Sequence, residues 1–239
     1  MESVPNFPAL NARNAMGYWF GAFLLGNIAS LLTVLLVWRP QNAGDPVPIR
    51  ATAASAVGLW AVFSLFLLLL SRGIGSRSMR HDFGLAVTAR DVLVGVPLGV
   101  FCQFVLVNIV NWPLSQFFPE HFSAEEVEKR ARELSDSAHG AWVIVLVLVV
   151  VVGAPVIEEL MYRGLVQQGL SNSLGAARGL VVAAVLFAAI HFQWIEFPGL
   201  FAFALVLGWC YRRTSRLGLG IIAHMAFNAS GLLVVSILN

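Results

Sequence analysis

Long stretches without charged side chains recur along this chain and alternate with short polar links. A stretch of about 20 apolar residues is long enough to cross the hydrocarbon of a bilayer as a helix. The pattern therefore predicts an all-α fold, a polytopic membrane helix bundle of about seven transmembrane helices. The predicted spans are residues 16–38, 51–71, 91–112, 140–164, 177–196, 198–211 and 218–238.

Arginines in two of the links orient the predicted bundle. Four arginines lie between the second and third spans and three between the sixth and seventh, and positive side chains concentrate in cytoplasmic loops. Residues 1–15 are then a cytoplasmic N-terminal tail, and residues 16–239 form one transmembrane domain. The first span is too long for the core of a signal peptide, and no small-residue cleavage pattern follows it, so we expect it to be retained.

Residues 113–139 lie outside in that orientation and contain an amphipathic, charge-rich stretch. Ser123 is followed by a helix-forming run with Glu126 at its third position, which is typical of a capped helix start. We expect an extracytoplasmic surface helix that is structural or acts as a lid, rather than a site for a partner protein.

Composition indicates an integral, multi-pass protein, which we expect in the cell membrane. Of the 239 residues, 58% are hydrophobic and only 12% are charged, which is far more apolar than a soluble domain of this size. The formal charge of +2 comes without a basic run interleaved with aromatic residues, so nothing indicates a nucleic-acid partner. Cys102 and Cys210 lie in apolar runs, where we expect them to pack as small hydrophobic side chains.

The fourth span carries an adjacent acidic pair, Glu158 and Glu159, and ionisable groups at such a place usually mark a functional site or a structural pair. Arg163 lies one turn after Glu159 on nearly the same helix face, whereas Glu158 is turned about 100° away. Glu158 is therefore predicted to be free to react, with Tyr162 as a hydrogen-bond partner. Pro155 should bend the helix and release a backbone carbonyl beside the site. The alternative is a helix end with solvated charges at the interface.

Two later spans each place a pair of side chains on one helix face. The fifth span carries Phe187 and His191, and the seventh carries His224 and Asn228, at a spacing of four residues in both cases. A lone histidine in a membrane helix is equally well explained by packing against a backbone carbonyl. Two histidines on separate spans, together with the amide and the acidic pair, favour a site. Glu196, at the end of the fifth span, is assigned to the membrane interface.

Together these groups suit hydrolysis of a peptide bond within the bilayer. Glu158 can act as a general base for water, and His191 can share that water. His224 and Asn228 can donate hydrogen bonds to the oxyanion that forms when a carbonyl is attacked. One feature fits poorly, because His191 lies about 10 Å out of level with the other groups when counted from the span ends.

A metal ion is a competing use of the same atoms. Glu158, His191 and His224 could form a first shell for a divalent metal such as zinc, with an open position for water. The His-Glu-x-x-His helix of soluble zincins is absent from the chain. A metal-dependent and a metal-free reaction therefore both stay open at this point.

The order of these motifs resembles the CPBP intramembrane proteases, which include the CAAX-processing endopeptidases and the bacteriocin-processing or Abi proteins. The resemblance covers residues 140–239, the predicted catalytic core, and rests on Glu158-Glu159-x-x-x-Arg163, Phe187-x-x-x-His191 and His224-x-x-x-Asn228 in that order. It implies that Glu158 and His191 activate water, that His224 and Asn228 stabilise the oxyanion, and that the remaining motif residues support them. The substrate would be a membrane-associated peptide or protein within the lipid bilayer.

Two functions from other classes could use the same residues. A proton- or solute-coupled transporter could use Glu158, His191 and His224 as a relay, but no inverted repeat is visible in the sequence. A catalytically silent membrane scaffold could bind and escort a partner. The intact set of reactive residue types favours the peptidase over this scaffold.

Overall fold

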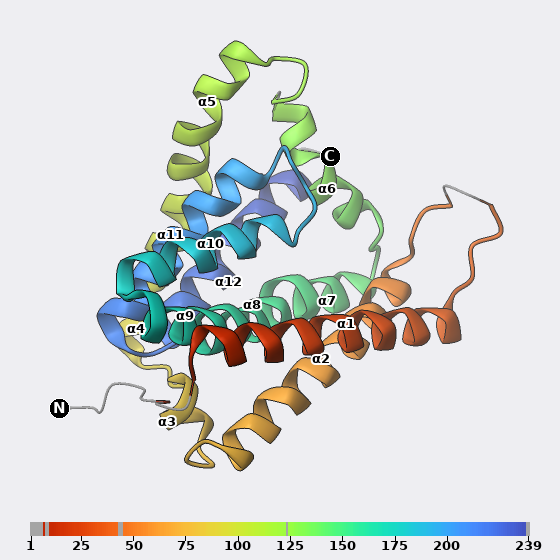
Figure 1. The fold of residues 1–239 in the computed structure, drawn as a ribbon. Helices are drawn as coiled ribbons and strands as arrows, with labels where there is room; N and C mark the ends of the chain where they lie inside the picture. The colour runs from red at the N-terminus through yellow and green to blue at the C-terminus, as the bar shows by residue number, and fades with distance from the viewer. Residues whose placement is uncertain (1–6, 8–9, 43–44, 123, 238–239) are drawn as a thin grey trace.

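The computed structural model describes residues 7, 10–42, 45–122 and 124–237, and these residues form helices and connecting turns without a strand (Figure 1). The predicted all-α helix bundle is confirmed. The helices are α1 (Ala12–Val37), α2 (Ile49–Gly73), α3 (Met79–Phe83), α4 (Ala89–Phe101), α5 (Val107–Phe117), α6 (Ala124–Asp136), α7 (Trp142–Leu146), α8 (Ala154–Glu159), α9 (Gln168–Leu174), α10 (Ala176–Ala189), α11 (Phe197–Thr214) and α12 (Gly218–Ile237).

Short π-helical segments join several of these helices end to end. They are Cys102–Leu106 between α4 and α5, Val147–Gly153 between α7 and α8, and Leu160–Gln167 between α8 and α9. Five helices of the described chain are consequently long and apolar enough to cross a membrane, namely Ala12–Val37, Ile49–Gly73, Ala89–Phe117, Trp142–Leu174 and Gly218–Ile237.

The predicted fifth and sixth spans, residues 177–196 and 198–211, differ from the other five. Helix α10 has only 14 residues, about 21 Å at 1.5 Å per residue, against about 30 Å of bilayer hydrocarbon. It ends at Ala189 because the chain turns there, with Phe192 at a left-handed φ of 53°. Helix α11 has 18 residues and ends in a basic turn. Neither helix is among the five candidate spans of the described chain. For α10, the apolar pattern could not show that the residues after Ala189 lie in a turn.

The helix Trp142–Leu174 is the centre of the bundle and packs against α1, α2, α10, α11 and α12. Glycines allow two of these close approaches. A Cβ atom at Gly153 would overlap the ring of Trp60, and one at Gly169 would overlap the methyl group of Ala15. Any larger side chain at either position would separate the central helix from its neighbours.

A hairpin at Gly175, whose φ of 83° suits glycine, joins the central helix to α10. Glu158 lies seventeen residues before Gly175, and His191 lies sixteen residues after it, so both are about 25 Å from the turn. The same register brings the rings of Tyr162 and Phe187 together at 5.2 Å between centroids. The antiparallel pair therefore places Glu158 and His191 at one level.

Helix α4 lies against α12 through two small residues one turn apart, Gly95 and Gly99. A Cβ atom at Gly95 would lie 2.9 Å from the Ile222 side chain, and one at Gly99 would overlap the Ala223 carbonyl oxygen. Small residues at this spacing allow the backbones of membrane helices to approach closely. This contact holds α12, which carries His224, in place.

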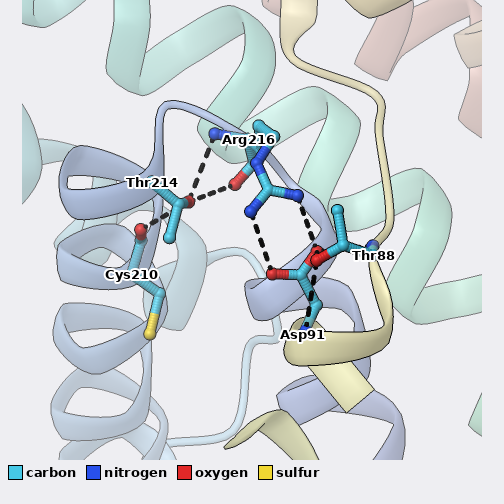
Figure 2. A network of polar contacts seen from close by, with 5 residues as sticks. All are labelled: Thr88, Asp91, Cys210, Thr214 and Arg216. Atoms are coloured by element: carbon cyan, nitrogen blue, oxygen red, sulfur yellow. Dashed lines mark hydrogen bonds and ion pairs between the residues drawn. The ribbon is translucent and has the colours of Figure 1, made fainter. Parts of the chain in front are cut away.

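A polar network ties the start of α4 to the turn between α11 and α12 (Figure 2). Thr88 caps α4 through two reciprocal hydrogen bonds. The Thr88 hydroxyl accepts from the Asp91 backbone N–H at 3.4 Å, and the Thr88 backbone N–H donates to Asp91 Oδ2 at 2.7 Å. Arg216 donates to the two Asp91 carboxylate oxygens at 2.9 and 3.3 Å. Thr214 accepts from the Arg216 N–H at 3.2 Å and can donate to the Cys210 carbonyl at 2.9 Å.

Asp82, in the short helix α3, is a second buried carboxylate outside the membrane-spanning segments. It accepts from the Ser71 hydroxyl at 2.6 Å and from the Ser76 N–H at 2.9 Å. Burial raises the pKa of Asp82, but these hydrogen bonds lower it by more, and the net pKa lies below the ordinary value of an aspartate. Asp82 is therefore ionised, and its carboxylate holds the turn after α2 in place.

Helix α6 occupies most of the charge-rich stretch, as predicted, and packs against α12 and α7. Ser135 and Ser236 share a hydrogen bond of 2.9 Å between α6 and the end of α12. The predicted cap, Ser123, lies outside the described residues. The placement of this helix outside the cell, like that of the N-terminus in the cytoplasm, stays a prediction.

Candidate active site

A cavity of about 320 Å³ lies between α5, α6, the central helix, α10, α11 and α12. The four predicted catalytic side chains all line it: Glu158 from α8, His191 from the turn after α10, and His224 and Asn228 from α12. These residues come from three helices distant in sequence. The structure therefore brings them together in one place, as the motifs predict, while their individual roles stay a prediction.

The two adjacent glutamates have different surroundings. Glu159 is fully buried, and its Oε1 accepts from Arg163 Nη1 at 2.8 Å. Arg163 Nη2 also donates to the Ala204 carbonyl at 3.1 Å, and its guanidinium lies 4.6 Å from the centre of the Phe187 ring. The Glu158 side chain is 26% exposed and borders the cavity. The predicted pairing of Glu159 with Arg163 is confirmed, and Glu158 is the more accessible carboxylate.

His224 lies between the two glutamates and connects them. Its Nδ1 is 3.2 Å from Glu159 Oε1, and its Nε2 is 3.8 Å from Glu158 Oε2. The first distance is a hydrogen bond, whereas the second is too long for one. Because a carboxylate accepts, Nδ1 carries a proton and the ring orientation is fixed. The sequence motif did not predict this bond, since the two residues are 65 positions apart.

His191 is held by its own helix. Its Nδ1 is 2.7 Å from the Phe187 carbonyl, and a carbonyl can only accept, so Nδ1 donates and Nε2 of the neutral ring is an acceptor. The expected offset of about 10 Å from Glu158 is wrong. The central helix continues to Leu174, well beyond the predicted end of the span at residue 164, and the hairpin at Gly175 restores the common level.

Asn228 binds a backbone carbonyl of the central helix. Its Nδ2 donates to the Val150 carbonyl at 2.8 Å. The helix is π-helical at this point, so the Ala154 N–H bonds the Val149 carbonyl five residues earlier. Pro155 comes next and has no N–H to continue this pattern to Val150. Asn228 thus binds a backbone carbonyl beside the site, which is consistent with the predicted release of a carbonyl at Pro155.

Two predicted supporting residues are aromatic. Phe187 packs against the rings of Tyr162, His191 and His224, with centroids 5.2, 4.9 and 5.9 Å away. Tyr162 is buried in this cluster and, among the described residues, makes no hydrogen bond with Glu158, so that prediction is wrong. The spacing of four residues holds for a regular α-helix, and the chain between them passes into a π-helical segment.

The candidate metal ligands do not gather as a metal would require. Within the described residues, no group of three His, Cys, Asp or Glu side chains is arranged to hold an ion. His224 Nδ1 and His191 Nδ1 are both engaged by protein acceptors, which leaves Nε2 of each ring directed elsewhere. The question of a metal-dependent or metal-free reaction stays as the sequence left it, and the steps proposed below are those of the protein's own side chains.

Three further polar residues line the cavity and were not recognised as part of a site from the sequence. They are Glu196, which the sequence assigned to the interface, and the amides Gln103 and Asn111 of the helix Ala89–Phe117. No motif marks them. The signal in the sequence that could have indicated them is the pair of amides, Gln103 and Asn111, eight residues apart in an apolar helix.

Comparisons with known proteins find a family match in the part of the chain that carries these motifs. Residues 140–230 match the family described as Rce1-like, the type II CAAX prenyl endopeptidases. The chain is similar to the Bacillus subtilis (strain 168) protein named "Putative membrane peptidase YdiL", with 20% identity over 222 residues that cover 88% of this chain and 86% of the relative. No solved structure matches. These findings confirm the predicted resemblance and support a CAAX-protease-like membrane peptidase.

Proposed function

We propose, from the premise that residues 140–230 are of the Rce1-like type, that this protein is an intramembrane endopeptidase. It would hydrolyse a peptide bond of a membrane-associated peptide or protein. The observation that carries the proposal is the convergence of Glu158, His191, His224 and Asn228 on one cavity. A carboxylate, two imidazoles and an amide supply both a base for water and donors for an oxyanion.

Glu158 and His191 form the basic side of the proposed site. Glu158 takes a proton from a water molecule that His191 Nε2 also holds as an acceptor, and the resulting hydroxide oxygen bonds to the carbonyl carbon of the substrate. The carbonyl oxygen then becomes an oxyanion. When the C–N bond breaks, Glu158 returns the proton to the leaving nitrogen, so that the products are a carboxylic acid and an amine.

His224 and Asn228 form the donor side. For His224 to donate to the oxyanion through Nε2 while Nδ1 donates to Glu159, the imidazole would carry a proton on both nitrogens. Asn228 uses one N–H for the Val150 carbonyl, and an amide has a second N–H for the oxyanion. Such donors act most strongly in an apolar, preorganised site.

The test uses the purified full chain in lipid nanodiscs with palmitoyl-anchored, quenched fluorescent decapeptides of mixed sequence. The wild-type protein should cleave members of this set, and Glu158→Gln and His191→Gln should lower the rate at least about 100-fold. Glu120→Gln and His139→Gln change exposed residues outside the cavity and should cleave at the wild-type rate. Equal cleavage by Glu158→Gln, or no cleavage by the wild type, would overturn the proposal.

A further inference from the structure

Two amide side chains in the catalytic cavity have no hydrogen-bond partner within the described residues. Asn111 is about nine-tenths buried, and its Oδ1 is inaccessible to water and makes no hydrogen bond. Gln103 lies two turns earlier on the same face of the helix Ala89–Phe117 and also makes no hydrogen bond to the described chain. A buried amide oxygen without a partner costs about 1–3 kcal/mol, so a ligand that donated a hydrogen bond to Asn111 would remove that cost, whereas Gln103 is half-buried.

These amides also line a second cavity of about 700 Å³. The two cavities share five lining residues, Gln103, Val107, Asn111, Ala131 and Gly231, and therefore adjoin. The amides lie where the space around Glu158 opens into the space along α5. Helix α6 contributes Ala131 to the walls of both cavities.

Two glycines lie against these amides. A Cβ atom at Gly231 of α12 would lie 3.2 Å from Gln103 Nε2, and one at Gly199 of α11 would lie 3.9 Å from Asn111 Nδ2. The Gln103 amide therefore packs closely against the backbone of α12, and the Asn111 amide lies within van der Waals reach of α11. These contacts hold both amides at the junction of the two cavities.

The spacing of the amides matches an extended peptide. Eight residues of helix separate Gln103 from Asn111, a rise of about 12 Å. An extended chain rises about 3.3 Å per residue, so about four of its residues span that distance, and residues four apart face the same side. Side-chain amides can donate to and accept from a peptide group at once.

We propose that Gln103 and Asn111 bind the main chain of an extended substrate segment beside the scissile bond, at two peptide groups about four residues apart. This inference rests on the proposed peptidase function and adds the conformation in which the substrate is held. Because the contacts are to peptide groups, the segment is recognised by its extended backbone, and its side chains can vary.

Kinetics on the best-cleaved decapeptide test the two residues. Gln103→Leu and Asn111→Leu should each raise KM about two- to tenfold with little change in kcat, because the bonds hold substrate and transition state alike. Asn27→Leu is the matched control, since Asn27 is an exposed amide on α1 that already donates to the Phe23 carbonyl at 2.7 Å. It should leave both constants unchanged.

A backbone N-methyl scan of the same decapeptide gives a second readout that a general loss of folding would not mimic. For the wild type, methylation should lower kcat/KM at two positions about four residues apart. Gln103→Leu should abolish the effect at one position and Asn111→Leu at the other. Uniform sensitivity along the peptide, or two sensitive positions that persist in both variants, would overturn this inference while leaving the peptidase function intact. No cleavage by the wild type would overturn both.

Discussion

Replacing Glu159 separates its effect on stability from its effect on the reaction. Glu159 accepts from both Arg163 and His224 through one oxygen, at 2.8 and 3.2 Å, and Arg163 is itself buried. Glu159→Leu leaves a buried cation without its partner, which typically costs about 3–5 kcal/mol. The double variant Glu159→Leu/Arg163→Leu removes both charges, and apolar pairs of this kind are often as stable as the ion pair they replace.

The double variant should therefore fold but cleave poorly. His224 would lose the acceptor that fixes its ring, and loss of a partner that orients an imidazole commonly costs about 10- to 100-fold in activity. Glu159→Gln/Arg163→Leu is the matched control, because it removes the same charges and keeps an oxygen for His224 Nδ1. It should cleave about ten times faster than the Leu/Leu variant.

The measurements are unfolding of each variant in mixed micelles and cleavage of the palmitoyl-anchored decapeptides. Variants that keep an unpaired buried charge should be less stable than variants that have lost both charges. Variants that keep an oxygen acceptor for His224 Nδ1 should cleave faster than variants that lack it. Equal cleavage rates for the Leu/Leu and Gln/Leu variants would refute the idea that Glu159 acts through His224. Similar stability for Glu159→Leu and the wild type would refute the buried ion pair.

Three further predictions concern other parts of the bundle. Asn228→Ala should lower the free energy of unfolding by about 1–3 kcal/mol. Adding Pro155→Ala should recover part of that loss, because alanine supplies a backbone N–H for the Val150 carbonyl. An unfolding curve for the double variant that shows no recovery would contradict this prediction. Arg216→Met should expose the N–H groups at the start of α4 around Asp91 to hydrogen exchange, at a cost of about 1–3 kcal/mol, and unchanged protection would contradict it. The pKa of Asp82 in the folded protein lies below its value in the unfolded chain. The ionised Asp82 therefore contributes to the free energy of unfolding above about pH 4, and this contribution is lost as the pH falls through the folded pKa. In Asp82→Asn, the free energy of unfolding should depend less on pH in that acid range than it does in the wild type.

Local periodicity was sufficient for most of the fold and for the central ion pair. Charge-free runs predicted the long helices, and the spacing of four residues predicted the contact between Glu159 and Arg163 because both depend on one helix alone. Three short motifs also predicted that Glu158, His191 and His224 would meet. Each of these inferences needs only helical geometry and the cost of burying charge in an apolar medium.

The remaining features depend on contacts that no local pattern records. The π-helical segment that begins at Leu160 changes which side chains share a face, and this is why Tyr162 does not reach Glu158. The bond between His224 and Glu159 joins residues on two helices, and its geometry follows from packing. The end of α10 at Ala189 is set by a turn within an apolar run, where composition alone favours a longer helix.

Glu158 lies seventeen residues before Gly175 and His191 sixteen residues after it, and this near-symmetry of the two arms restricts how the chain can change in evolution. One residue inserted into either arm alone would advance its side chain about 1.5 Å and rotate it about 100°. Insertions and deletions in this region must therefore occur in compensating pairs, whereas links such as the one between α1 and α2 are free to vary in length. Among descendants of a common ancestor, the count of residues on each side of Gly175 should be conserved more strictly than most of the residues themselves.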